Sequence, residues 1–425
     1  MAEVATIRTA HHVGTSGYRR VTAALCAAGF ASFSAMYCTQ ALLPALAEDY
    51  RVPPATATLT VSLTTALLAL FIIPMSVLSE RYGRVNVMLI SGMVSAVVGL
   101  VLPFSPSLEF LIAGRAIQGI ALAGVPAVAV AYLAEEIHAA SLSSALGRYI
   151  AGNTMGALLG RVVPSEVVEL TNWRVALVVC SLTTLVGTVI FALLVPRSQF
   201  FSPKTVGPRD VVRNLGAHLR KPLMIKLFLF GFLLMGSFVT MYNFLGFRLM
   251  AQPFGLKHST VGLLFLLYIV GTWTALGAGR LADRMGRVVL LGIALPFVFA
   301  GLLVTTSHLL PVIVFGLGVF TGGFFAAHTV ASGWVGAVAQ NNRAEASGLY
   351  LFSSYLGASV AGSLGGVVYG SGGWSSTALF VGTLLVIALG LVGLLVNSAH
   401  ARAVSIPAAT IEPAYCTAGP DIVAS

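Results

Sequence analysis

The chain has 425 residues, of which 57% are hydrophobic and only 9% are charged, whereas about 25% of the residues in a soluble globular chain are charged. With a mean hydropathy of +0.92, a soluble protein of this size could not bury its apolar surface, which excludes a cytosolic enzyme, a secreted disulfide scaffold and a disordered protein. The long apolar runs also exclude an outer-membrane barrel, whose strands alternate apolar and polar residues. The composition therefore predicts a helical membrane protein.

The basic excess of the chain favours a membrane topology over nucleic-acid binding. The formal net charge is +10 at pH 7, and the basic residues of membrane proteins concentrate in cytoplasmic loops. We therefore expect a lipid bilayer, and no nucleic acid, as the partner. Three of the four cysteines lie in apolar runs and none belongs to a CxxC pattern, so no metal site is expected.

Apolar runs recur along the chain, each near the roughly 20 residues that cross a bilayer as a helix. The first run follows Arg19-Arg20 but is too long for a signal peptide. Twelve spans are expected, at residues 21–47, 56–79, 85–103, 108–134, 143–164, 174–195, 222–247, 259–281, 287–306, 309–339, 345–370 and 374–397. They divide the chain into an N-terminal tail (1–20), a six-helix half (21–195), a linker (196–221), a second six-helix half (222–397) and a C-terminal tail (398–425).

The distribution of lysine and arginine predicts the orientation. If the N-terminus is cytoplasmic, all but six of the 24 basic residues fall in cytoplasmic segments. Of those six, Arg115 lies inside a span, and the others are placed at periplasmic ends: Arg51, Arg161, Arg174, Arg248 and Lys257. This bias predicts a multi-pass protein of the bacterial inner membrane with both tails and the linker in the cytoplasm.

A short charged segment after the second span is repeated after the eighth. Residues 80–84 read ERYGR and residues 283–287 read DRMGR, roughly 200 residues later. Gly160 and Gly365, and likewise Trp173 and Trp374, recur at nearly the same offset. The repeat predicts a duplicated six-helix unit, as in many transporters.

The second copy belongs to a longer motif, GRLADRMGR at residues 279–287, which resembles the G-x-L-x-D-R-x-G-R loop signature of the major facilitator superfamily. In that family the motif is thought to hold the cytoplasmic side closed, and an acid beside arginines can form such a breakable latch. The alternative is ordinary cytoplasmic charge around a glycine turn. The latch prediction covers Glu80, Arg81, Gly83, Arg84, Gly279, Asp283, Arg284, Gly286 and Arg287. Glu135 and Glu136 are possible partners of Arg84.

Arg115 is the basic residue placed inside a span. Charged residues in spans usually face the interior of the helix bundle, and Gln118 lies on the same helical face at i+3. The pattern R-x-x-Q-G resembles the fourth-helix motif of the same family, in which the arginine is linked to proton coupling. The alternative is an arginine that extends to the nearby periplasmic interface.

Glycines at four-residue spacing predict close helix packing. The fifth span carries Gly152, Gly156 and Gly160, and the eleventh carries Gly357 and Gly365, which are small-xxx-small stripes. The first stripe weakly resembles the antiporter motif of drug exporters, although Ala157 stands where that motif has proline. Packing alone explains both stripes.

Polar and aromatic residues inside the spans are candidates for a central cavity. The alternative for each residue is a structural role, in which it forms a hydrogen bond between helices or fills the core. The set is Tyr37, Gln40, Gln118, Asn153, Tyr242, Asn243, Phe324 and Tyr355. His328 is the only histidine well inside a span, and histidine titrates near physiological pH.

None of the 14 acidic residues is placed within the bilayer core. Glu48 and Asp49, with Glu109, Glu166 and Glu169, fall at periplasmic ends of spans, and the others are cytoplasmic. Proton coupling must then depend on Arg115, His328, Glu48 or Asp49.

The whole chain resembles the major facilitator superfamily, and several stretches resemble its bacterial YnfM-type branch, which is grouped with drug-efflux carriers. Examples are YLAEEIH at 132–138, GFFAAH at 323–328 and SGLYLF at 347–352. The resemblance implies a monomeric transporter, not an enzyme, that exports small organic or amphipathic compounds by alternating access, with the proton gradient in place of a cofactor. Proton-linked uptake of a sugar or organic acid, or a membrane sensor that does not transport, are the alternatives.

Overall fold

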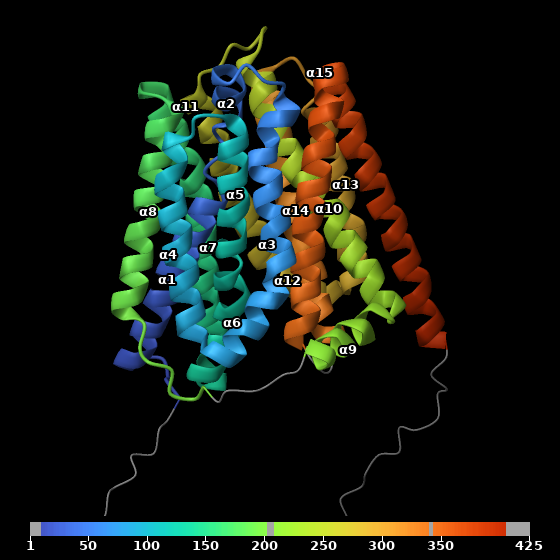
Figure 1. The fold of residues 1–425 in the computed structure, drawn as a ribbon. Helices are drawn as coiled ribbons and strands as arrows, with labels where there is room; N and C mark the ends of the chain where they lie inside the picture. The colour runs from blue at the N-terminus through green and yellow to red at the C-terminus, as the bar shows by residue number, and fades with distance from the viewer. Residues whose placement is uncertain (1–9, 202–207, 340–342, 405–425) are drawn as a thin grey trace, which may run out of the picture.

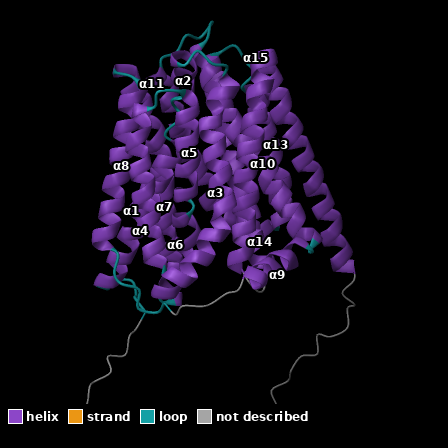
Figure 2. Cartoon of the chain, in the orientation of Figure 1, coloured by secondary structure: helices purple, strands orange, loops and turns teal. Residues whose placement is uncertain are grey.

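The structure, a computed structural model, describes residues 10–201, 208–339 and 343–404; the remaining parts of both predicted tails, and Cys416, lie outside it. The described residues form helices and loops and no strands (Figure 2). In chain order the elements are α1 (Ser16–Tyr37), α2 (Leu43–Asp49), α3 (Pro54–Tyr82), α4 (Arg84–Val101), η1 (Leu102–Phe104), α5 (Leu108–Leu122), α6 (Gly124–Glu136), α7 (Ala139–Leu170), α8 (Trp173–Leu194), α9 (Pro208–Leu219), α10 (Pro222–Met250), α11 (His258–Leu263), η2 (Leu264–Leu267), α12 (Tyr268–Met285), α13 (Arg287–Val304), α14 (Leu310–Val338) and α15 (Arg343–Val404).

Within these residues, nine helices or helix runs are long and apolar enough to cross a membrane. One of them, in α15, is two helices joined at a kink, because Gly372 and Gly373 have non-helical backbone angles. Two more helices, α1 and α7, are long enough but more polar, so the bundle has twelve helices of spanning length. The prediction of an all-α membrane protein is confirmed.

The first span is shorter than expected. A helix over residues 21–47 was the expectation, but α1 ends at Tyr37, a turn follows, and α2 begins with Pro44 in its first turn. The carbonyls of Ala35 and Met36 accept hydrogen bonds from Arg115. The helix therefore ends inside the bundle without leaving these polar groups unpaired.

The two halves repeat the same turn. Gly83 joins α3 to α4 with φ 95° and ψ 141°, and Gly286 joins α12 to α13 with φ 92° and ψ 142°. A residue with a side chain is disfavoured at such positive φ, which explains glycine at both sites. The matching backbone supports the duplicated unit inferred from the sequence.

The glycine stripes lie where helices pack most closely. A methyl group added to Gly152, Gly156 or Gly160 of α7 would come closer than 3.0 Å to backbone atoms of α1. Gly357 and Gly365 of α15 have the same relation to atoms of α10. The two pairs, α1 with α7 and α10 with α15, are equivalent in the two halves.

We expect Gly156→Ala to destabilise the protein and Gly147→Ala not to. The new methyl would overlap Phe30 at position 156, whereas nothing lies within 4 Å of Gly147 on the same helix. Overpacking of this kind costs about 1–3 kcal/mol. Thermal unfolding of the purified variants should show a lower midpoint only for Gly156→Ala. Equal midpoints would contradict the close packing of α1 and α7.

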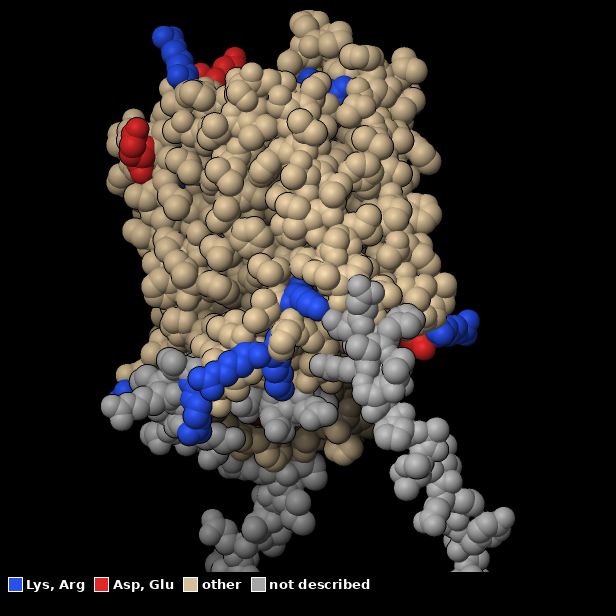
Figure 3. All heavy atoms as spheres, turned by 90° about the vertical axis from the view of Figure 1, so that its right-hand side faces the viewer, with Lys and Arg blue, Asp and Glu red and all other residues tan. Residues whose placement is uncertain are grey.

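The bundle has two distinct ends. Helix α1 begins and α15 ends at the same end, here called the terminal end, where α9 also lies (Figure 1). Helices α2 and α11 lie at the opposite end (Figure 1). On the face drawn in Figure 3, the belt between the ends is free of charged residues, and Lys and Arg gather toward the terminal end. Such a belt matches the apolar core of a bilayer.

Helices from both halves meet along the centre of the bundle. Helix α3 packs against α15, and α7 packs against α11 and η2. The α3–α15 contact runs from Ala55 and Gly366 near the opposite end to Ile73 and Gly348 near the terminal end. Helix α12 makes its main contacts within its own half, to α14 and α13.

Candidate functional site

Arg161 lies in the interior of the bundle, not at its periplasmic end. Its exposed fraction is 2%, and α7 continues to Leu170, beyond the expected end of the span at residue 164. The placement of Arg161 at a periplasmic end is therefore wrong. The physical reason is that the guanidinium points into the boundary between the two halves, where partners from both compensate its burial.

The guanidinium of Arg161 contacts aromatic rings from both halves. Its Cζ atom lies 3.7 Å from the ring centroid of Tyr37 in α1, 4.9 Å from that of Tyr268 and 5.3 Å from that of Phe265. The faces of aromatic rings attract cations, and this attraction is strongest where water is excluded. Three rings thus stabilise a buried charge.

An amide pair continues this site across the boundary. Arg161 Nε donates to Gln40 Oε1 at 2.7 Å, and Gln40 Nε2 donates to Asn243 Oδ1 of α10 at 2.7 Å. Arginine can only donate, so Gln40 must present its oxygen to Arg161 and its NH2 group to Asn243. The Asn243 amide then has its own NH2 group left over, and this buried nitrogen has no hydrogen-bond partner among the described residues.

Tyr268 adds a second unused donor. Its hydroxyl is buried and has no hydrogen-bond partner in the described part of the chain, although its ring lies beside Arg161. Among the described residues, no carboxylate oxygen lies within 4.0 Å of the Arg161 guanidinium. The site therefore has hydrogen-bond donors and a positive charge without a matching acid.

A small cavity of about 20 Å³ borders this site on the side of the opposite end. It is lined by Gln40, Asn243, Tyr242 and Phe265, and it extends to His258. A cavity of this size holds about one water molecule. The two halves are thus in close contact between Arg161 and the opposite end.

Glu169 closes the opposite end. Its Oε2 atom accepts a hydrogen bond from the backbone N–H of His258 at 2.9 Å, and Lys257 Nζ lies 3.8 Å from its Oε1 atom. This carboxylate of α7 meets the positively polarised start of α11 in the other half. One turn earlier on α7, Ser165 packs against Gly262. Contacts between the halves therefore continue from Arg161 to this end.

We expect Glu169→Gln to loosen this closure. The variant loses its charge opposite Lys257 and the helix start, and a hydrogen bond to a charged group contributes about 1.5–3 kcal/mol. The measurement is the labelling rate of a cysteine at Ser165 by a membrane-impermeant maleimide, in a background without the native cysteines. Labelling should accelerate in Glu169→Gln but not in Glu166→Gln on the same helix. Equal rates would argue against this latch.

Comparisons with known proteins agree with this architecture. A model of the Major Facilitator Superfamily matches residues 25–248 and 237–415. The chain belongs to the Major Facilitator Superfamily. It is similar to the uncharacterized MFS-type transporter YybF of Bacillus subtilis (40% identity, 91% of this chain and 95% of that protein). It is also similar to the inner membrane transport protein YnfM of Escherichia coli (39% identity, 88% of this chain and 90% of that protein).

A solved structure shows the same fold. A bacterial homolog of the human lysosomal transporter Spinster, in an inward-facing and occupied conformation, matches with a TM-score of 0.73 at 16% identity, over 90% of this chain and 98% of that one. The predicted fold of two six-helix halves and the resemblance to YnfM are confirmed. The protein is a multi-pass membrane transporter and not an enzyme.

Of the residues predicted for the cavity of this transporter, Tyr37, Gln40 and Asn243 meet at Arg161. Tyr242 lies beside them: its hydroxyl is hydrogen-bonded to Thr321 Oγ1 at 2.7 Å, and its ring stacks on Phe265.

The other cavity candidates lie apart from Arg161 or are packed among other rings. Phe324 stacks on Phe238 at 3.8 Å and on His328, whose Nδ1 lies 3.1 Å from the Tyr350 hydroxyl. Tyr355 is buried in a cluster with Tyr37. Asn153 faces Gly29 of α1. Phe324, His328 and the rings that they contact all lie within the C-terminal half.

Arg115 and Gln118 form a separate network within the N-terminal half. Arg115 is fully buried and donates to the carbonyls of Ala35, Met36 and Thr60 and to the Gln118 side chain. Gln118 in turn donates to the Ser95 carbonyl. All these partners lie in α1, α3, α4 and α5, so this pair does not contact the boundary between the halves.

The acidic coupling candidates lie at the opposite end. Glu48 and Asp49 end the short helix α2, and both are exposed. Asp49 Oδ2 accepts a hydrogen bond from Trp173 Nε1 at 2.7 Å, which ties α2 to the start of α8.

The two copies of the loop motif differ in their contacts. Arg84 donates to Glu135 Oε1 through Nε at 3.1 Å and Nη2 at 2.9 Å, and lies 3.7 Å from Glu80; Arg81 of the same copy stacks on Tyr82. In the second copy, Gly279, Asp283 and Arg284 are exposed. Neither that aspartate nor Arg284 or Arg287 has an ion pair within the described part of the chain. The second copy matches the family motif more completely, and it is the copy without ion pairs among the described residues.

Glu136, next to the acid that pairs with Arg84, holds the start of the linker. Its Oε1 atom accepts hydrogen bonds from Ser198 Oγ at 2.6 Å and from the backbone N–H groups of Gln199 and Phe200. The carboxylate is fully buried, so the linker leaves the N-terminal half along a fixed path.

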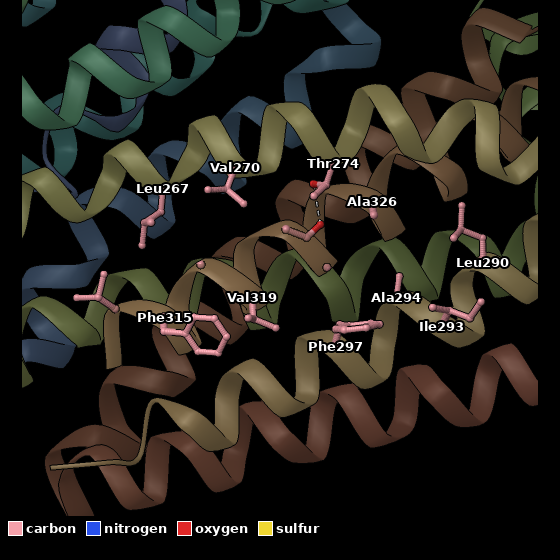
Figure 4. A pocket seen from close by; sticks show the side chains of 14 residues that line it. Leu267, Val270, Thr274, Leu290, Ile293, Ala294, Phe297, Phe315, Val319 and Ala326 are labelled. Atoms are coloured by element: carbon pink, nitrogen blue, oxygen red, sulfur yellow. Dashed lines mark hydrogen bonds between the residues drawn. The ribbon is translucent and has the colours of Figure 1, made fainter. Parts of the chain in front are cut away.

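A larger cavity lies away from this site. It measures about 540 Å³ and lies between α12, α13 and α14 (Figure 4). Its one polar side chain, Thr274, donates to backbone carbonyls including that of Gly322. Its lining residues Phe297 and Phe315 are largely exposed, which fits a groove that faces lipid tails.

Arg161, Phe265 and Tyr268 were not among the predicted site residues. A signal for Arg161 was present, because Arg161, Ser165 and Glu169 follow one another at four-residue spacing and so share one face of α7. That polar face meets the other half. No comparable pattern marks Phe265 and Tyr268 among the many aromatic residues of the chain.

Proposed function

We propose that this chain is a proton-coupled exporter of small organic or amphipathic compounds that works by alternating access. The observation that carries the proposal is the charged and polar site between the halves, where Arg161, Gln40 and Asn243 connect α7, α1 and α10. A buried charge in a membrane protein is costly and usually marks a transport pathway. Here it lies where relative movement of the halves would change its contacts.

The opposite end is closed by the Glu169–His258 contact, and the halves also meet near the terminal end through Ile73 and Gly348, which fits a nearly closed state of the transport cycle. The protein works as a monomer in the bacterial inner membrane, with both termini in the cytoplasm, and the terminal end is the cytoplasmic one. The basic residues of the loops support this orientation. In the outward-facing state, the Glu169–His258 contact would break and the unpaired second motif copy would close.

The proton gradient supplies the energy, and no other cofactor is required. His328, Arg115, Glu48 and Asp49 remain the proposed coupling groups. Of these, His328 lies within the C-terminal half in contact with the Tyr350 hydroxyl. Its titration would therefore change the packing of α14 against α15.

The test is substrate-induced proton movement in everted membrane vesicles. Acridine orange reports the pH gradient while compounds are added: 1-naphthoate, chloramphenicol, ethidium, arabinose and succinate. We expect an amphipathic compound to release more protons from vesicles that contain the protein than from vesicles that lack it. Arabinose and succinate should not have this effect. Further acidification of the lumen on addition of arabinose or succinate would favour proton-linked uptake of that class, because a symporter carries proton and substrate in the same direction. If no compound moves protons and none accumulates with the gradient, coupled export is wrong.

A further inference from the structure

We infer that the site between the halves binds the anionic group of its substrate, and that the substrate is an organic carboxylate with an aromatic or apolar body. This inference deepens the proposed function and rests on it. Arg161 is the residue that would bind the anion, together with the unused donors of Asn243 and Tyr268.

The first observation is that Arg161 differs from the other buried arginines. Arg84 is paired with Glu135, and Arg115 has three backbone carbonyls and a side-chain oxygen as acceptors. Arg161 has two acceptors in the described residues, Gln40 Oε1 for its Nε and the Ala157 carbonyl for its Nη1. A guanidinium has five N–H donors. Its positive charge and its Nη2 group therefore have no anionic partner among the residues that the structure describes.

The second observation is that the neighbouring unused groups are also donors. Asn243 is 2% exposed, and within the described residues neither its Nδ2 atom nor the Tyr268 hydroxyl has a hydrogen-bond partner. An unpaired buried polar group costs about 1–3 kcal/mol. A guanidinium and an amide NH2 group can only donate, and a phenol can donate as well, so an acceptor oxygen can satisfy all three. A carboxylate supplies two such oxygens and the missing negative charge.

The third observation concerns the body of the ligand. The rings of Tyr37, Phe265 and Tyr268 surround the guanidinium, and Tyr242 stacks on Phe265. These walls favour an aromatic or apolar group beside the carboxylate. The adjoining cavity of about 20 Å³ is too small for such a molecule, so the ligand enters when the halves separate.

The same geometry disfavours other substrates. A cation would be repelled by Arg161 at a site from which water is largely excluded, where charges interact strongly. A neutral amide would leave the charge of Arg161 without a counter-ion. The site therefore discriminates by charge before it discriminates by shape.

The experiment measures binding to the purified full chain with three matched probes: 1-naphthoate, 1-naphthamide and 1-naphthylmethylammonium. Binding is read as the concentration-dependent rise of the melting temperature, since a ligand of the native state stabilises it. We expect 1-naphthoate to stabilise the wild-type protein and the other two probes to have no effect. In Arg161→Gln, its affinity should fall about 10–100-fold, the loss of one charged hydrogen-bonding partner. Arg148→Gln, on the same helix near the terminal end, should bind as the wild type does.

Asn243→Asp separates anion binding from a structural role of Arg161. This variant keeps the guanidinium and nearly the same volume but places a carboxylate at the site. If the site binds anions, 1-naphthoate should no longer stabilise the variant, while its melting temperature without ligand stays equal or rises. Unchanged 1-naphthoate binding in either site variant overturns the inference.

The inference is also overturned if the neutral or cationic probe binds as well as 1-naphthoate, or if 1-naphthoate does not bind the wild type. Failure of the proposed function gives a different pattern. Specific 1-naphthoate binding without transport would remove the exporter and leave the anion site. Coupled transport of a neutral compound that Arg161→Gln still carries would remove the anion site and leave the exporter.

Discussion

Replacing Arg161 with glutamine should lower the rate of substrate transport about 10- to 100-fold while leaving the protein folded. The variant loses the charge that three aromatic rings and Gln40 stabilise at the boundary between the halves. Hydrogen bonds to charged groups contribute about 1.5–3 kcal/mol, and each 1.4 kcal/mol corresponds to about a factor of ten. The measurement is the initial rate in everted vesicles for the compound identified by the proton assay.

Arg148→Gln is the matched control for this prediction. It removes the same guanidinium from the same helix, but at an exposed position where Arg148 contacts Thr22 and the ring of Tyr18. Its transport rate should stay within about twofold of the wild type, because an exposed contact of this kind contributes little. Wild-type transport by Arg161→Gln would exclude this arginine from the transport cycle.

Replacing Arg115 with lysine should destabilise the N-terminal half by about 3 kcal/mol or more. The guanidinium donates to the carbonyls of Ala35 at 2.8 Å, Met36 at 2.7 Å and Thr60 at 3.2 Å. A single ammonium cannot reach all three, and each buried carbonyl left without a partner costs about 1–3 kcal/mol. The amount of folded protein after extraction in detergent, and its melting temperature, should both fall.

Arg174→Lys is the matched control for this second prediction. Arg174 also donates to two backbone carbonyls, those of Pro103 and Ser105, but it is only partly buried at the opposite end. Water can replace its lost bonds, so the melting temperature should change little. If Arg115→Lys instead folds normally and loses only the pH dependence of transport, the proton-coupling role would gain support over this structural one.

Several features of the transporter were predictable from local sequence. The apolar runs, separated by basic loops, indicated the spans because a helix in lipid must satisfy its own backbone and expose apolar side chains. The repeat of residues 80–84 at 283–287 indicated two equivalent halves, and Gly83 and Gly286 have nearly identical backbone angles. The glycine stripes also lie at close helix contacts, because a missing side chain permits close approach whatever the partner.

Partners across the boundary were decided only by the tertiary structure. Arg115 and Arg161 are both arginines near small residues in apolar runs, yet the first binds carbonyls of its own half and the second joins the halves. The difference depends on which face of each helix meets which neighbour, and on where α7 ends. A periodic pattern indicates that a face is buried, but it does not identify the residues that face it.

The sequence by itself thus determined that the protein lies in a lipid bilayer, and it determined the number of spans, the internal repeat and the family. These depend on composition and on motifs of a few residues. The tertiary structure decided that α1 breaks at Tyr37, that Glu169 closes one end, and that an arginine with no acidic partner among the described residues lies between the halves. These properties depend on contacts such as that between Gln40 and Asn243, about 200 residues apart in the chain, which only the packing of the two repeated units brings together.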